Sequence, residues 1–414
     1  MLNMKTIWKY PLPTDEKSRD CDYESPIYEY GNEVLFPFRY MHATVLYVID
    51  TFTGRGTTLP LDTNTAVMAW EFFMEPFPDG VVIYAGDIFW YCSGKIKKAI
   101  DMTQYGKVIS HAVWSGYIYL LCVRDGKHTL ACFDSKNKDI TWKLDVTTEA
   151  YTPGPIYFFE EKVTCFAHGE LLFIDLEKGT VLSSIRILHA NKLFCPIRLD
   201  EENLAIGFTN WTNAGILKYN LKSKKVEWKT GRKFEGPLLR CKIHRNNGNL
   251  IWVKNDRELI CLDELTGAEK YRVSTLPWLY TDLQFSGDRT LFGTSGADGF
   301  LNCIRTDTGK EIWKLPLKDG CAFFKMQNDS VFVGDFSKRI MQIDIETGKI
   351  LKELQTTGEV VGRIEVQNKA LYTVVWGNAT SNISLIKVDI GADKKSFFGH
   401  FKKNACKLRE GEER

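Results

Sequence analysis

The sequence lacks both a long apolar run and an export signal. Nowhere do eighteen apolar residues follow one another, and a transmembrane helix needs about that length. The first ten residues, MLNMKTIWKY, contain two lysines and no apolar stretch with a small-residue cleavage site. We therefore expect neither a membrane partner nor secretion.

Paired cysteines are also missing. The eleven cysteines are dispersed singly, with no Cys-x-x-Cys motif and no two adjacent in the sequence. An odd, scattered set of this kind predicts buried reduced thiols rather than a disulfide framework. Because reduced thiols are typical of the cytoplasm, we expect a cytoplasmic protein.

The sequence has little excess charge and no catalytic or metal-binding signature. A formal net charge of +2 argues against an extended nucleic-acid surface, which needs a concentrated excess of Lys and Arg. No nucleophile elbow, phosphate loop or dinucleotide fingerprint occurs. No His-x-x-x-His or Cys/His pair has metal-ligand spacing. We therefore expect no metal and no cofactor.

What the sequence does contain is a repeat of about forty residues, running from near residue 26 to near residue 390. The clearest copies are RTDTGKEIWKL (305–315), QIDIETGKILKEL (342–354), CLDELTGAEKYRV (261–273) and YVIDTFTGRGTTL (47–59). A repeat of this length indicates a radial or linear repeat architecture, because one such unit cannot bury its faces alone.

Each repeat contains two turn signals between short apolar runs. The first turns include Gly31-Asn32, Asn247-Gly248 and Asn328-Asp329, and the second include Thr53-Gly54, Thr308-Gly309 and Thr347-Gly348. Such residues close β-hairpins. Two hairpins per repeat predict a four-stranded antiparallel blade. The chain is thus predicted to be all-β, a single closed β-propeller, with nine repeats counted and an eight-bladed ring as the alternative.

One line of the repeat carries a family resemblance. Residues 307–314, DTGKEIWK, are similar to the repeat of the pyrroloquinoline-quinone-type (quinoprotein-like) β-propellers, which include quinoprotein dehydrogenases and the outer-membrane assembly lipoprotein. The resemblance implies that the tryptophan of the outermost strand packs against the neighbouring blade. Trp142, Trp228 and Trp313 match that position, whereas Tyr271, Leu351 and Ser183 depart from it.

The same resemblance bears on catalysis. A quinone-dependent dehydrogenase of this family implies a vicinal disulfide, calcium ligands and a catalytic aspartate, and this sequence has no adjacent cysteines. The chain therefore resembles the non-catalytic branch, typified by the assembly lipoprotein. We expect no quinone cofactor, and more generally we lean toward a protein that is not an enzyme.

The N-terminal residues predict how the ring closes. Residues 7–13, IWKYPLP, nearly repeat residues 312–317, IWKLPL, so they resemble an outermost strand without a blade of its own. The last repeat supplies strands near 361–366, 370–376 and 383–390, with a degraded turn at Gly391-Ala392. An N-terminal strand that completes this blade would leave no open sheet edge. Residues 1–400 are thus predicted to form the propeller and residues 401–414 a charged tail.

Cationic residues on the predicted innermost strands form the candidate ligand site. They are Arg198, Arg240, Lys242, His244, Lys325 and Arg363. If they converge on the channel, they would bind an anionic ligand or an acidic loop of a partner. The alternative is that each pairs locally, for example with Glu29, Asp200 or Glu365, because buried Lys and Arg are normally paired.

Aromatic residues near strand ends form a second candidate surface. They are Phe72, Phe73, Phe77, Trp90, Tyr91, Trp211, Trp278 and Tyr280. Exposed together, they would form an interaction face, but we expect them to fill the gaps between blades.

The sequence as a whole favours an intracellular, non-catalytic binding platform for a protein or peptide. The alternative function is a hydrolase or lyase that acts on an anionic saccharide at the central channel. A pair of inward carboxylates roughly 5 to 10 Å apart would favour that alternative.

Overall fold

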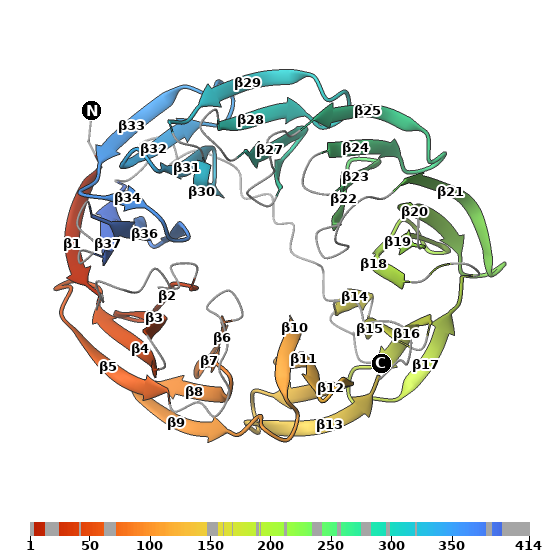
Figure 1. Ribbon diagram of the computed structural model, residues 1–414, viewed down its shortest axis with the longest axis horizontal. Helices are drawn as coiled ribbons and strands as arrows, with labels where there is room; N and C mark the ends of the chain where they lie inside the picture. Colours follow the sequence, from red (N-terminus) through yellow and green to blue (C-terminus); the bar gives the residue numbers. More distant parts are fainter. Residues whose placement is uncertain are drawn as a thin grey trace, which may run out of the picture.

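The structure is a computed structural model and consists of β-strands joined by turns and connections (Figure 1). It describes residues 4–12, 25–40, 43–61, 72–146, 156–159, 161–167, 169–187, 190, 192–210, 213–233, 242–254, 258–274, 283–294, 299–318, 321–377 and 383–390. Within these ranges no helix is long and apolar enough to cross a membrane.

The strands form nine sheets arranged as a ring, which we number as blades 1 to 9. Blade 1 consists of β2 (Tyr28–Tyr30), β3 (Glu33–Tyr40), β4 (Ala43–Asp50) and β5 (Gly56–Leu61). Blade 2 consists of β6 (Phe73–Phe77), β7 (Gly80–Tyr84), β8 (Ile88–Cys92) and β9 (Lys95–Ile100). Blade 3 consists of β10 (Lys107–Trp114), β11 (Tyr117–Arg124), β12 (Lys127–Asp134) and β13 (Asp139–Asp145). Blade 4 consists of β14 (Tyr157–Phe159), β15 (Lys162–Ala167), β16 (Glu170–Asp175) and β17 (Val181–Ile185). Blade 5 consists of β18 (Lys192–Arg198), β19 (Asn203–Thr209), β20 (Asn213–Asn220) and β21 (Lys225–Lys233). Blade 6 consists of β22 (Lys242–Asn246), β23 (Asn249–Lys254), β24 (Glu258–Asp263) and β25 (Glu269–Ser274). Blade 7 consists of β26 (Gln284–Ser286), β27 (Arg289–Gly293), β28 (Phe300–Arg305) and β29 (Glu311–Pro316). Blade 8 consists of β30 (Cys321–Gln327), β31 (Ser330–Asp335), β32 (Arg339–Asp344) and β33 (Ile350–Gln355). Blade 9 consists of β34 (Glu359–Val360), β35 (Glu365–Gln367), β36 (Ala370–Trp376), β37 (Ile383–Asp389) and β1 (Lys5–Pro11).

The predicted fold is therefore confirmed, with nine blades rather than eight. Because successive strands of a blade are antiparallel, the turns alternate between two faces of the ring. We call the face with the first-to-second and third-to-fourth strand turns the turn face. We call the opposite face, with the second-to-third turns and the connections between blades, the connector face.

Aspartate side chains hold several turns between the third and fourth strands. The Asp50 Oδ1 accepts the backbone N–H of Thr53 at 2.7 Å, and the Asp344 Oδ1 accepts that of Thr347 at 2.8 Å. The following glycine, Gly54 or Gly348, has a φ of +68°, which glycine adopts without steric cost. The repeated Asp-x-x-Thr-Gly motif is thus a local turn structure with its own hydrogen bonds.

The hydrophobic core is distributed between neighbouring blades. One buried cluster joins Leu291 of blade 7 to Val331 of blade 8, and another joins Phe36 of blade 1 to Leu385 of blade 9. Each blade therefore depends on its neighbours for burial, as expected of a repeat protein.

An aromatic ring on the outermost strand docks on the turn of the next blade at five junctions. The ring N–H groups of Trp8, Trp142, Trp228 and Trp313 donate to backbone carbonyls in those turns at 2.9 to 3.0 Å. The Tyr271 hydroxyl donates to the Thr306 carbonyl at 2.8 Å. The predicted docking of Trp142, Trp228 and Trp313 is confirmed. Tyr271, which departs from the family pattern in residue type, makes the same contact.

The turn glycine is needed at each of these contacts. A Cβ atom built on Gly348 would lie 2.6 Å from the Trp313 ring, and one built on Gly179 would lie 2.4 Å from the Trp142 ring. Real Cβ atoms essentially never approach a neighbour so closely. The glycine therefore provides both the positive φ and the space for the ring.

A β-bulge accompanies the docking position. In eight blades the register between the third and outermost strands shifts near the turn, as between Cys303 and Ile304 in blade 7. The β4–β5 pair of blade 1 has no such shift. In blade 8 the residue at this position is Lys352, paired with Gln342, and its Nζ donates to the Ile390 carbonyl at 2.6 Å. The alignment of Leu351 with this position was wrong by one residue, because Lys352 is the residue that lies four after the turn glycine Gly348, as Trp313 lies four after Gly309. Leu351 is 42% exposed.

The N-terminal strand closes the ring as predicted. β1 pairs antiparallel with β37, with Lys5 opposite Asp389 and Pro11 opposite Ser384, and in Figure 1 it lies on the outer edge of blade 9. The innermost strand predicted near 361–366 is present but interrupted. β34 ends at Val360 and β35 begins at Glu365, and both pair with β36. Between them the amides of Val361 and Gly362 both reach the Val374 carbonyl, which interrupts the regular ladder. The turn at residues 391–392 and the tail at 401–414 lie outside the described residues.

Seven described cysteines are free. Six of them are buried: Cys122, Cys132, Cys165, Cys195, Cys261 and Cys303. Burial raises the pKa of the Cys122, Cys165 and Cys303 thiols to about 12. The predicted buried thiols are thus confirmed at these positions.

Trp313→Ala is expected to lower the free energy of unfolding by about 3 to 5 kcal/mol, because it empties a buried site and removes a buried hydrogen bond. The ring is only 9% exposed. Trp228→Ala is expected to cost less, since that ring is only partly buried. Denaturant titration checks this, with Leu351→Ala as the control that changes stability by less than about 0.5 kcal/mol. Equal, small effects for all three would contradict the docking role.

Deletion of residues 1–12 is expected to lower stability by several kcal/mol, because it exposes the edge of β37 and removes the buried Trp8 ring. Ile7→Ala is the matched control, since Ile7 is 44% exposed on the same strand. Thermal melting of the three proteins checks the prediction. A truncated protein that melts with the full chain would show that β1 does not hold the ring closed.

The six buried thiols are expected to resist thiol reagents in the native protein and to react in denaturant. Raising the pH from 7 to about 9, which ionises an ordinary cysteine, should leave them protected. Because the folded-state pKa of the Cys122, Cys165 and Cys303 thiols lies above the unfolded value, their contribution to stability is complete below about pH 8.5 and falls as the pH rises toward 12. Rapid native labelling of these six, read by peptide mass spectrometry, would disprove the assignment.

Candidate functional site

The predicted cationic residues lie on four blades. Arg198 ends β18 of blade 5, Lys242 and His244 lie on β22 of blade 6, Lys325 lies on β30 of blade 8, and Arg363 lies between β34 and β35 of blade 9. Arg240 lies outside the described residues. β18 and β30 are on different sides of the ring's middle in Figure 1. Their convergence on one ligand stays a prediction.

Arg198 contacts its own turn and the preceding blade. Its Nε donates to the Asp200 carbonyl at 3.0 Å, and its guanidinium lies 5.9 Å from the centroid of the Phe159 ring. The Asp200 carboxylate accepts hydrogen bonds from the Asn203 side chain and from the Glu202 and Asn203 amides. These bonds, the Asn203 side chain first, lower the pKa of Asp200. The Asp200 carboxylate, which the sequence suggested as an ion-pair partner of Arg198, thus stabilises a turn.

Lys325 bridges two blades. Its Nζ lies 3.2 Å from the Glu365 Oε2 on β35 of blade 9. The local pairing expected as the alternative is therefore confirmed for Lys325. Arg363 of blade 9 lies two residues before Glu365 in the sequence and is partly buried.

His244 lies beside the next blade. Its ring is 5.4 Å from the ring of Phe285 on β26. The adjacent Arg245, which the sequence did not single out, binds Glu264 through Nε and Nη2 at 2.7 and 2.9 Å. Its Nη1 donates to the Arg198 carbonyl of blade 5 at 2.8 Å. The hydrogen bonds that Arg245 donates to the Glu264 carboxylate raise the pKa of Arg245.

Polar side chains of the innermost strands join several other neighbouring blades. The His111 Nε2 lies 3.2 Å from the Glu75 Oε1, and the Gln284 Oε1 accepts the Met326 N–H at 2.8 Å. The Glu29 N–H donates to the Gln367 Oε1 at 2.8 Å across the closure of the ring. Sequence reasoning missed these bridges, because each joins residues of different repeats and has no local motif.

The predicted aromatic residues behave as gap fillers where the structure describes them. Phe72, Phe73, Phe77, Trp90 and Tyr91 are buried, and Tyr91 is fully so. The Tyr91 hydroxyl donates to the Glu33 carboxylate of blade 1. Trp211, Trp278 and Tyr280 lie outside the described residues.

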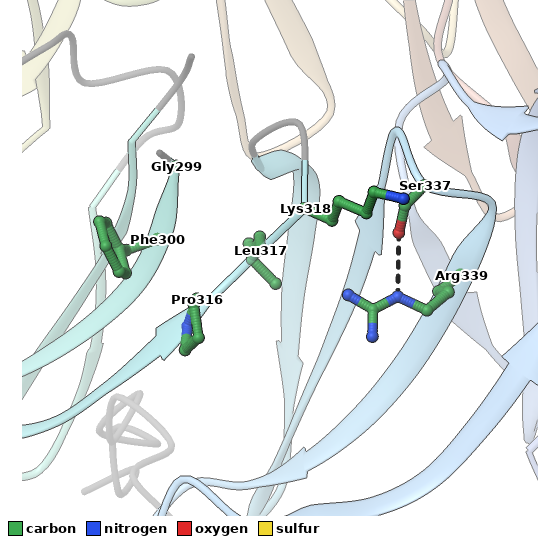
Figure 2. Close-up of a pocket in the computed structure, with 7 residues that line it drawn as sticks. All are labelled: Gly299, Phe300, Pro316, Leu317, Lys318, Ser337 and Arg339. Atoms are coloured by element: carbon green, nitrogen blue, oxygen red, sulfur yellow. Dashed lines mark hydrogen bonds between the residues drawn. The ribbon is translucent and has the colours of Figure 1, made fainter. Parts of the chain in front are cut away.

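An open pocket lies between blades 7 and 8 on the connector face (Figure 2). Its volume is about 600 Å³. Blade 7 contributes Phe300, Pro316 and Leu317, followed by Lys318, and blade 8 contributes Ser337 and Arg339. We call it the connector-face pocket. It places apolar side chains beside two cations at the junction of two blades.

The charges of the connector-face pocket differ in their freedom. Arg339 is fixed by the fully buried Asp335, with Nη2 and Nε at 2.6 and 2.9 Å from the carboxylate Oδ2. The Arg339 Nε also contacts the Ser337 hydroxyl at 3.0 Å, drawn dashed in Figure 2. Lys318 is exposed. The pocket thus has an ordered guanidinium on one side and a solvent-facing ammonium on the other.

Metal ligation finds no support in the described part of the chain. No group of three or more His, Cys, Asp or Glu side chains there could hold a metal ion.

Comparisons with known proteins match this architecture. The sequence model of a family described as the outer membrane protein assembly factor BamB matches residues 297–392, which include β28 through β37 and the connector-face pocket. A search of curated protein sequences finds no significant match.

Solved structures with the same fold include propellers of different activities. BamB from Moraxella catarrhalis has a TM-score of 0.50 and 16% identity, with 78% of this chain and 99% of BamB covered. The quinohemoprotein alcohol dehydrogenase from Comamonas testosteroni has a TM-score of 0.57 and 10% identity, with 94% and 77% covered. The computationally designed Ika8 protein has a TM-score of 0.51 and 13% identity, with 92% and 99% covered. At these identities the likeness concerns the fold. The chain is a β-propeller that resembles BamB, and its residues 297–392 are similar to the BamB family model.

Proposed function

We propose that the protein is a non-catalytic platform that binds another protein or peptide. The observation that carries the proposal is the connector-face pocket, which is open and combines apolar side chains with the exposed Lys318. Pockets of this composition suit a peptide segment, because apolar contacts supply affinity and a few polar groups fix orientation. The pocket walls come from strands of two blades, so the surface is presented on a rigid scaffold.

The family match supports the same proposal. The matched segment contains the connector-face pocket, and the family is described as an assembly factor, a role that involves protein partners. Fold alone does not establish function, so this support is secondary to the pocket.

The proposal also covers the chemistry of the partner and the cellular compartment of the protein. Exposed Lys318 suits an acidic segment or another anionic ligand. The inner-strand cations Arg198, Arg240, Lys242, His244 and Arg363 would add to this preference, whereas Lys325 already pairs with Glu365. The buried free thiols support a cytoplasmic setting, where thiols stay reduced.

The inner carboxylates favour the platform over the hydrolase or lyase alternative. Glu365 lies at 3.2 Å from the Lys325 ammonium, and Glu75 lies at 3.2 Å from the His111 ring. Both therefore act in contacts between blades. A glycosidase instead needs two carboxyl groups that flank one bond of the substrate.

The test captures a partner from native extract and then measures its affinity. The full chain and the designed Ika8 propeller are used as baits. A protein retained only by the full chain is purified and titrated by calorimetry against the full chain and its Lys318→Glu variant. Lys318→Glu is expected to weaken binding at least about tenfold, or 1.4 kcal/mol. Lys310→Glu is the matched control, because Lys310 is exposed on blade 7 at the turn face.

Two outcomes would contradict the proposal. One is that no protein is retained above the Ika8 control. The other is that the purified chain converts sulfated or uronic-acid saccharides to products. An unchanged affinity for Lys318→Glu together with a loss for Arg363→Ala would move the binding surface from the connector-face pocket to the inner strands.

A further inference from the structure

A second pocket lies between blades 3 and 4 on the turn face. Its volume is about 630 Å³. Its walls are aromatic and acidic, with Trp114, Tyr117 and Tyr119 from blade 3 and Glu161, Asp175 and Glu177 from blade 4. We call it the aromatic–acidic pocket. None of its lining residues, within the described chain, is a lysine, arginine or histidine.

The aromatic wall is held in place from behind. The Phe158 ring centroid lies 5.3 Å from that of Trp114 and 5.4 Å from that of Tyr119. The Tyr119 hydroxyl donates to the Leu176 carbonyl at 3.2 Å, and the Trp142 ring donates to the same carbonyl at 3.0 Å. The wall is therefore fixed by the docking contact between blades 3 and 4.

Trp114 is placed at this wall by the local backbone. It ends β10, and the next two residues, Ser115 and Gly116, turn the chain with φ angles of +47° and +88°. Its indole remains 41% exposed, whereas Tyr119 is fully buried. A large aromatic side chain is thus ordered by its neighbours and still accessible from solvent.

The acidic wall comes from two turns of blade 4. Glu161 lies in the turn before β15, Asp175 ends β16, and Glu177 lies in the turn between β16 and β17. The Asp175 Oδ1 accepts the N–H groups of Glu177 and Lys178 at 2.9 and 2.8 Å, whereas Glu161 and Glu177 are exposed. Lys178 belongs to the same turn but is not among the lining residues.

The electrostatic setting of the pocket is negative. The charge of Asp134 raises the pKa of the nearby Tyr117 hydroxyl, with further contributions from burial and from Glu177. The chain as a whole has a net charge of +2, so this negative region is local to the junction of blades 3 and 4.

We infer that the aromatic–acidic pocket binds a lysine or arginine side chain of a protein partner. A cation is attracted to the face of an indole or phenol ring, and an arginine guanidinium forms paired hydrogen bonds with carboxylates. The lining supplies both kinds of group, the aromatic rings from blade 3 and the carboxylates from blade 4. This inference rests on the proposed platform function and assigns the turn face a basic segment as ligand.

The test uses a fluorescein-labelled tetra-arginine peptide and a matched tetra-citrulline peptide, which keeps the shape and removes the charge. Fluorescence anisotropy with the full chain is expected to show binding of the arginine peptide that weakens as salt is added. The citrulline peptide is expected to bind at least about tenfold more weakly, because it has neither the cation–π nor the ionic contact.

Variants locate the binding site. Trp114→Ala is expected to weaken tetra-arginine binding about three- to fivefold, as for loss of one exposed cation–π contact, and Trp114→Phe to weaken it less. The Glu161→Gln, Glu177→Gln double variant is expected to weaken binding and flatten its salt dependence. Phe52→Ala and Glu311→Gln are the controls, because both residues are exposed at turn-face positions of other blades. Melting curves confirm that every variant is folded.

Three results would overturn the inference. The first is no binding of tetra-arginine at protein concentrations up to about 1 mM, which would detect even weak complexes. The others are equal binding of the citrulline peptide and unchanged peptide binding by the pocket variants. The peptide assay needs no cellular partner. A failure here with a partner still captured through Lys318 therefore removes only the inference. Peptide binding without any captured partner would leave the pocket assignment and remove the platform.

Discussion

The structure depends on the contact between the outermost strand of one blade and the turn of the next. Trp313 combines a buried ring, a hydrogen bond to the Ile345 carbonyl at 2.9 Å and close packing on Gly348. The turn is itself held by Asp344. Because a blade buries its faces only against its neighbours, these contacts convert local turn chemistry into the geometry of the ring. The aromatic–acidic pocket lies directly beside one of them, since the Leu176 carbonyl serves both Trp142 and Tyr119.

Most of the fold could be predicted from the sequence, because hairpin turns and alternating apolar runs are local signals. The nine blades and the closing strand followed from turns such as Thr308-Gly309 and from the similarity of residues 7–13 to residues 312–317. The bulge could not be predicted, because it depends on how two strands pair. The misplacement of Leu351 has a different cause, since Lys352 lies four residues after Gly348 just as Trp313 lies four after Gly309. The interrupted inner strand at Gly362 depends likewise on a carbonyl of the neighbouring strand, at Val374.

The candidate sites were much less predictable than the fold. Charge and strand position suggested Lys325 and Arg198 as ligand-binding residues. In the structure Lys325 pairs with Glu365 of the next blade, and Arg198 packs near Phe159 of the preceding blade. Both pockets lie at junctions, where residues of different repeats meet. Trp114 and Glu177 illustrate the difficulty. Trp114 belongs to no motif, and Glu177 occupies a variable position of a turn motif, so only the docking of blade 4 on blade 3 places them in one cavity. Sites of this kind are determined by the junction, and the repeat pattern contains no information about them.

The pairing of β1 with β37 has a consequence for the order of folding. Lys5 lies opposite Asp389, so the first strand of the propeller to be synthesised pairs with the last strand that the structure describes in it. Contacts of such sequence separation form slowly, because a long loop must close before any of them is gained. During synthesis the β1 segment and the advancing edge of the newest blade remain without their final partners. Such unpaired edges are prone to pair with other chains. Ring closure therefore marks the point at which a growing chain loses its capacity for intermolecular strand exchange.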